Sequence, residues 1–204
     1  MANPNAPHGL NPVRYLNGAN WNQQANLYRI PAADTTAYAI GDVIKSLAGC
    51  DAFGVPNVII AAAGNTPRGV IVGVVVSSTT GAGAVANAVP NLNVTQIPAV
   101  KASDYYILVA DDPNIIFEAQ CNNTAAFVST NVGKNASIVY AAPGASVSST
   151  QVDSGTFATT STLVLKVLGF AQRINIDTTV LNNYTPLLVS FNVHELKGAG
   201  VAGV

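Results

Sequence analysis

Residues 104–120, with the sequence DYYILVADDPNIIFEAQ, constrain the fold of this chain more than any other stretch. Two apolar runs, residues 105–110 and 115–120, are rich in the β-branched and aromatic side chains that favour strands. Between them lies Asp-Asp-Pro-Asn, in which proline sets φ at about −65° and the Asp and Asn side chains can bond to their own backbone. This pattern predicts a β-hairpin.

The two runs differ in how their faces alternate. Both faces of the first run are apolar, which is typical of a strand buried on both sides at the centre of a sandwich or barrel. The second run places Glu118 and Gln120 on a wetter face, opposite its apolar residues. We therefore expect this hairpin to form the middle of an all-β domain.

Other segments of the chain show weaker strand patterns. The further predicted strands are residues 38–45, 58–63, 69–76, 137–141, 163–170 and 187–194. The strands at 58–63 and 69–76 are expected to pair as a second hairpin. Residues 77–89 and 143–150 are predicted loops, and residues 122–130 could hold one helical turn capped by Asn123 or Thr124. About eight to ten short strands with almost no amphipathic helix predict one jelly-roll-like sandwich or barrel, covering residues 27–196.

The ends of the chain are predicted to lie outside this domain. Residues 1–26 are rich in Asn, Pro, Gly and Gln and show no apolar period, which indicates an extended arm. The arm carries four isolated large side chains, which we expect to bind a neighbouring subunit because such residues dominate interface energetics: Leu10, Tyr15, Leu16 and Trp21. The alternative is a terminus without contacts. Residues 197–204, KGAGVAGV, are predicted to be a flexible tail.

Composition favours a protein that works in an assembly. Hydrophobic residues make up 49% of the 204 residues, so a sizeable core can form, but charged residues make up only 9%. Ordinary soluble domains carry about a quarter. Frequent apolar runs argue against disorder, and the most apolar region, residues 58–76, is interrupted by GNTPRG and is too short to span a bilayer as a helix. We expect self-association into a dimer or trimer, and no membrane partner.

Charge, cysteine content and the N-terminal sequence argue against a nucleic-acid-binding, disulfide-rich or secreted protein. The net charge is −1 and the Lys and Arg residues are scattered singly, so binding to nucleic acid is not expected. Cys50 and Cys121 are too few for a disulfide framework; they fit buried small hydrophobes, with one disulfide as the alternative. The N-terminal sequence lacks the basic and apolar regions of a secretory signal, so synthesis in a cytoplasm is expected.

The sequence contains no recognisable catalytic or cofactor motif. Of the two histidines, His8 lies in the arm and His194 at the end of the last strand, where an interface or structural role is expected. No zinc, P-loop or nucleophile-elbow motif is present. Asp111 and Asp112 could offer hard oxygen ligands to calcium, but without the spacing of a calcium loop we expect them to close the hairpin. We predict no enzyme activity, no cofactor and no metal.

Several stretches together resemble a family of tailed-bacteriophage virion proteins that are usually encoded beside the major capsid protein. The stretches are VRYLNGANWNQQANLYRIPAAD, IGDVIKSLAGCDAFGVPNVIIAAAGNTPRGVIVGVVV, YYILVADDPNIIFEAQ, NVGKNASIVY, LVLKVLGF and a last strand ending in Asn-Val-His. The similarity covers residues 10–194, and DDPN-x-x-FE-x-Q at residues 111–120 is its most specific part.

The resemblance implies a head decoration, or cement, protein. Members are thought to be β-rich, jelly-roll-like subunits that oligomerise and clamp neighbouring capsid subunits, without catalytic residues. The expected partner is then the major capsid protein, and the expected location is the capsid surface of the virion, assembled in the host cytoplasm. An alternative of another class is a receptor- or glycan-binding β module of a virion fibre.

Overall fold

The computed structural model describes residues 3–75, 92–144, 147–172 and 183–203. It confirms the all-β prediction, because within the described residues the only helix is a 3₁₀ turn, η1 (Ser129–Asn131). The strands are β1 (Asn11–Tyr15), β2 (Asn26–Ile30), β3 (Tyr38–Ala39), β4 (Val43–Cys50), β5 (Pro56–Ile60), β6 (Gly69–Val74), β7 (Gln96–Ile97), β8 (Tyr105–Ala110), β9 (Ile115–Gln120), β10 (Asn135–Val139), β11 (Gln151–Ala158), β12 (Leu165–Phe170) and β13 (Pro186–Phe191).

The first half of the chain forms a closed barrel, which we call the first barrel. Its strand order is β2-β5-β4-β6-β8, closed by antiparallel pairing of β8 with β2. Alternation puts one side-chain set inside, because successive residues of a strand point to opposite faces. The interior contains Ile44, Ile71 and Val109, each at most 1% exposed. The short β3–β7 pair adds Tyr38, which is fully buried in the same core.

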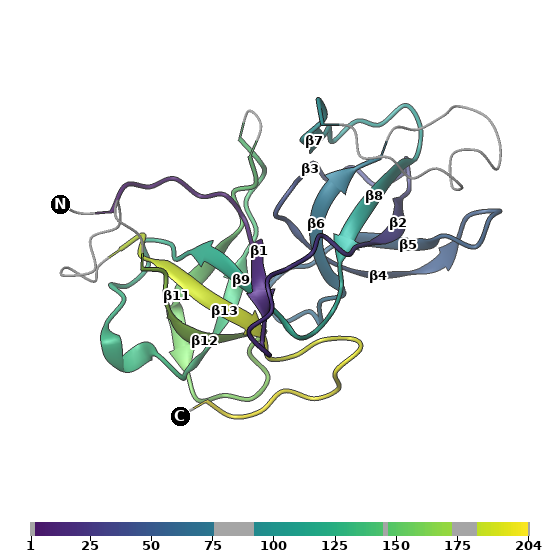
Figure 1. The fold of residues 1–204 in the computed structure, drawn as a ribbon. Coiled ribbons are helices and arrows are strands. Elements are labelled where there is room, and N and C mark those ends of the chain that lie inside the picture. The colour runs from purple at the N-terminus through teal and green to yellow at the C-terminus, as the bar shows by residue number, and fades with distance from the viewer. Residues whose placement is uncertain (1–2, 76–91, 145–146, 173–182, 204) are drawn as a thin grey trace.

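The second half forms a curled sheet with the order β1-β9-β13-β12-β10-β11. It curls until Cys121, directly after β9, makes a parallel bridge with Val152 of β11. We call β9 to β13 the second barrel, with β1 as an added strand. Phe117 and Phe191 meet in its core with ring centroids 5.2 Å apart. Figure 1 shows the two barrels with β1 at their boundary.

The predicted hairpin at residues 104–120 is wrong, although both of its strands exist. β8 pairs with β2 and β6 of the first barrel, whereas β9 pairs with β1 and β13. The Asp-Asp-Pro-Asn turn is therefore the connection between the barrels. Burial is also reversed: all six residues of β9 are buried, while β8 has three that are only half-buried. The expected hairpin of residues 58–63 and 69–76 is likewise wrong, because β5 and β6 both pair with β4.

The chain ends also differ from expectation. Residues 11–15, placed in an extended arm by the sequence, form β1 and pair with β9, so this segment belongs to the folded body. Val201 in the tail donates its backbone N–H to Asn192 Oδ1, so the tail is packed on the second barrel rather than free. Residues 27–196, expected as one domain, contain both barrels, which share one buried apolar cluster, and the jelly-roll order is not seen among the described strands.

Two smaller predictions had other outcomes. No helical turn forms over residues 122–128; η1 lies just after them and has no side-chain cap. Strand β11 was not expected, because its residues QVDSGTFA carry few bulky apolar side chains. The loop predicted at 77–89 lies outside the described residues, as do residues 145 and 146 of the loop predicted at 143–150.

Candidate functional site

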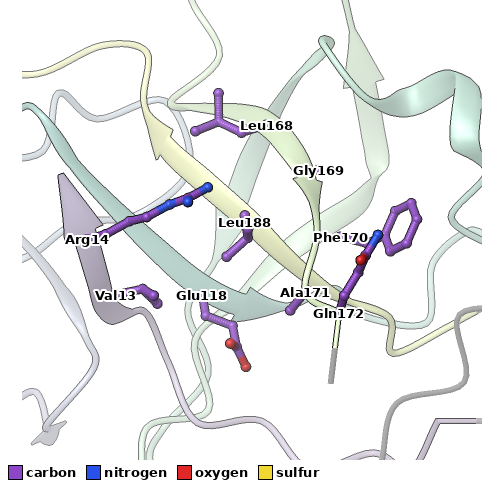
Figure 2. A pocket seen from close by; sticks show the side chains of 9 residues that line it. All are labelled: Val13, Arg14, Glu118, Leu168, Gly169, Phe170, Ala171, Gln172 and Leu188. Carbon is purple, nitrogen blue, oxygen red and sulfur yellow. The ribbon is translucent and has the colours of Figure 1, made fainter. Parts of the chain in front are cut away.

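A groove of about 570 Å³ lies on the outer surface of the second barrel. Strands β1, β9, β12 and β13 supply its walls and floor (Figure 2). The lining residues are Val13, Arg14, Glu118, Leu168, Gly169, Phe170, Ala171, Gln172 and Leu188. The lining combines aliphatic side chains with polar groups, and exposed aliphatic side chains are typical of a surface that binds another protein segment.

A β-bulge in β12 lies at the apolar side of the groove. The pairing of β12 with β13 shifts register between Val167 and Gly169, so that Leu168 is the extra residue. Leu168 directly follows buried Val167 and faces outward by alternation, where it is 36% exposed. It lies beside Leu188, which pairs with Gly169 on one side and with Glu118 on the other.

The charged residues of the groove have different environments. Arg14 is exposed, and Figure 2 shows its side chain extended across the strands toward Leu168. The Glu118 side chain is 6% exposed, and its carboxylate lies 3.9 Å from His8 Nε2. In Figure 2 that carboxylate points away from Arg14. The groove therefore offers an apolar floor with a cation at its edge, which suits an apolar segment that also carries a carboxylate.

The four residues expected to bind a partner have separate fates. Leu10 is 0% exposed and lies in the buried core that the two barrels share. Tyr15 and Trp21 are half-buried and pack against that core. Leu16 is 47% exposed and is the only one of the four with a largely free side chain. The structure thus buries most of this set. Leu16, directly after β1, is the exception.

Hydrogen bonds hold the N-terminal segment in place. Gln120 Nε2 donates to the Pro4 carbonyl oxygen at 2.9 Å, and the Ala6 N–H donates to Gln120 Oε1 at 3.0 Å. The Leu10 N–H donates to the Gly41 carbonyl oxygen at 2.8 Å, which ties the segment to the first barrel. The segment is therefore fixed to both barrels, and the side chains it leaves outside are presented on a rigid surface.

Sequence reasoning missed the residues that line the groove. Val13 is 40% exposed on β1, next to Arg14, in a run of only five residues whose single proline, Pro12, masked the strand. Leu168 lies in the run LVLKVLGF, two positions after Lys166 and therefore on the same outer face as that lysine. That alternation was one available signal, and the glycine after Leu168 was another, because glycine inside a strand often marks a bulge.

A second polar cluster lies between the barrels and shows why Asp111 does not offer a cation site. Asn26 Nδ2 donates to Asp111 Oδ1 at 2.8 Å, and the Tyr28 hydroxyl donates to Oδ2 at 2.7 Å. Arg68 lies 3.6 Å from the same oxygen and donates through Nε to the Tyr28 hydroxyl at 2.7 Å. Asp112 instead accepts the backbone N–H of Asn114. Among the described residues, no group of three or more His, Cys, Asp or Glu is placed to hold a metal ion.

His194 lies at the edge of this cluster and has a structural environment. It is 1% exposed, and its Nδ1 accepts the backbone N–H of Leu196 at 3.1 Å. Burial lowers the pKa of its imidazole. A neutral imidazole accepting at Nδ1 carries its proton on Nε2. The neighbouring Glu195 accepts hydrogen bonds from the backbone N–H and the hydroxyl of Ser46.

Comparisons with known proteins give no relative for this site: no protein-family model, curated protein or solved structure matches the chain. In the part of the chain that the structure describes, helix is limited to three residues and no helix could cross a membrane.

Proposed function

We propose that this protein is a structural component of a tailed-bacteriophage virion, a head decoration protein that binds the outer capsid surface across subunit boundaries. The groove beside β1 carries this proposal, because it joins exposed apolar side chains, Val13 and Leu168, to a rigid frame. A chain with 9% charged residues is suited to burying surface in an assembly. The sequence resemblance given above supports the same function.

Binding would work through buried area. In this proposal a segment of the major capsid protein lies over Leu168 and Leu188, with a carboxylate near Arg14. Leu16, which directly follows β1 and is exposed, extends this surface. Single contacts of this size are weak, but a subunit that self-associates as a dimer or trimer and touches two capsid subunits gains from effective concentration. The protein would then resist separation of neighbouring capsid subunits.

Co-sedimentation with undecorated heads of the parent phage tests the proposal. The variant Leu168→Asp places a charge on the groove floor, where Leu168 is 36% exposed. The matched control is Leu47→Asp on β4 of the first barrel, where the leucine is 37% exposed. We expect Leu168→Asp to weaken head binding by about tenfold or more and Leu47→Asp to bind like the wild type.

Two results would contradict the proposal. If the wild-type protein does not sediment with heads at micromolar concentration, decoration is not its function. If Leu168→Asp, folded by circular dichroism, binds as tightly as Leu47→Asp, the groove is not the capsid-binding surface. Sedimentation velocity of the free protein tests the proposed self-association. We expect a species heavier than the 20.9 kDa monomer.

A further inference from the structure

The two barrels have the same strand connectivity. In chain order, the strands are β2, β4, β5, β6 and β8 in the first barrel and β9 to β13 in the second. If the strands of each barrel are numbered one to five in chain order, their order around the barrel is 1-3-2-4-5, and strand 5 pairs with strand 1. The first and third strands are parallel in both, through Arg29 with Asn57 and through Cys121 with Val152.

The residue pairing is also the same, down to one irregularity. In the first barrel β6 and β8 pair as Ile71 with Val109 and then Gly73 with Leu108, with a bulge between. In the second barrel the corresponding pairs, with a bulge at the same point, are Val167 with Val189 and Gly169 with Leu188. The bulged residues are Val72 and Leu168. Because one residue of slip would move every side chain to the other face, this agreement defines equivalent positions.

Backbone hydrogen bonds confirm that equivalence outside the strands. The Gly41 N–H donates to the Ile71 carbonyl oxygen at 2.8 Å, and the Gly133 N–H donates to that of Val167 at 2.9 Å. Both glycines have positive φ, 98° and 88°. A positive φ favours glycine at the entry to each second strand. The chain is therefore a repeat of one five-stranded unit.

One face of the first barrel is docked on the second. Val43, Val70 and Ala110 are neighbours across β4, β6 and β8, each at most 1% exposed, and they belong to the same buried cluster as the core of the second barrel. Beside them Asp42 accepts hydrogen bonds from Ser148 and Thr150. This apolar face is the one through which a barrel of this kind contacts another.

The equivalent face of the second barrel has a different composition and a different cover. The matching residues are Asn135, Lys166 and Ser190, which pair with one another in the same way. The C-terminal tail lies over them: Asn135 Nδ2 donates to the Val201 carbonyl oxygen at 2.8 Å, and Lys166 Nζ to that of Ala202 at 3.5 Å. A Cβ on Gly203 would lie 2.9 Å from the Cα of Lys134, so the tail is in close contact with this face.

We propose that residues 198–203 cap the repeat: the tail occupies on the second barrel the face by which the first barrel docks, and so prevents a barrel of a second copy of this chain from binding there. The polar residues beneath the tail act in the same direction, because they remove the apolar area that such docking needs. Repeat proteins commonly end in a unit with a polar outer face for this reason. An uncapped face would favour head-to-tail contacts that do not close.

Four proteins test the cap: the wild type, a deletion of residues 198–204, Lys166→Val, and the two changes together. Lys166→Val reproduces the residue of the first barrel, Val70, at the centre of the face. We expect the combined variant to self-associate at least about tenfold more tightly than the wild type in sedimentation velocity. Lys166→Val with its tail should stay within about threefold of the wild type.

The four proteins distinguish the effect of the tail on self-association from the effect of Lys166 beneath it. Tighter association on deletion alone would also support a cap. If the combined variant associates like the wild type, or if Lys166→Val gains as much with the tail as without it, the tail does not block a docking face. Hydrogen exchange provides an independent readout, because deletion should raise exchange in β10 and β12 and leave β4 and β6 unchanged.

Discussion

Replacing Tyr28 by phenylalanine would remove the central hydroxyl of the polar cluster between the barrels. Tyr28 is 3% exposed, and its hydroxyl both donates to Asp111 at 2.7 Å and accepts from Arg68 at 2.7 Å. Each hydrogen bond to a charged group contributes about 1.5–3 kcal/mol. Arg68 and Asp111 stay 3.6 Å apart without it and partly compensate. We expect Tyr28→Phe to lower the free energy of unfolding by about 2–4 kcal/mol.

Tyr106→Phe is the matched control. Its hydroxyl also donates to a carboxylate, Asp51, at 2.6 Å, but that pair lies near the surface, where water replaces the lost partner. We expect a loss of about 1 kcal/mol or less. Urea unfolding at pH 7 measures both, and for a chain of this size the buried substitution should lower Tm by about 5–15 °C. Equal losses for the two variants would refute the reasoning that burial makes the Tyr28 hydroxyl important.

The Tyr28 hydroxyl also makes the stability of the folded protein depend on pH in the alkaline range. Burial and the Asp111 carboxylate raise the pKa of Tyr28 to about 12 from its ordinary 10. A raised pKa favours the neutral phenol in the folded state, so its contribution is fully present below pH 10 and is lost as pH rises toward 12. Tyr28→Phe should therefore lose stability less steeply between pH 10 and pH 11 than the wild type does.

Other predictions follow from single environments. Burial lowers the pKa of His194, so the stability that the neutral imidazole contributes is present above pH 6.5 and declines as pH falls below that value. The NMR titration of its ring should show a midpoint below 6.5. A midpoint at or above 6.5 would contradict the burial. Cys50 is exposed and free, whereas burial raises the pKa of the Cys121 thiol to about 11, so a thiol reagent should modify one cysteine quickly in the folded protein and both in urea. Gly69→Ala should cost more than about 2 kcal/mol, because its Cβ would lie 2.5 Å from the Ala110 carbonyl oxygen, while the Gly144→Ala control meets nothing within 4 Å and should be near neutral.

The groove shows what local pattern can and cannot find. Residues 163–170 and 187–194 were expected as strands because apolar and β-branched residues dominate them, and the structure has strands at Leu165–Phe170 and Pro186–Phe191. Alternation puts Leu168 on the outer face, but the groove exists only once β1, β9, β13 and β12 lie side by side. The partner-binding set was chosen for large side chains in an irregular segment. Leu10 left that set because the fold buries it between two barrels, which no local pattern records.

The sequence by itself determined the all-β class and most strand positions, because alternation and β-branching act within a few residues. It did not determine pairing: the residues on either side of Asp112 read as one hairpin, yet they join different barrels through partners about seventy to a hundred positions away. It also hid the repeat, since Val70 and Lys166 are equivalent in register but opposite in chemistry. The composition of each barrel face matches what covers it, the other barrel or the tail, and that cover is a property of the tertiary structure alone.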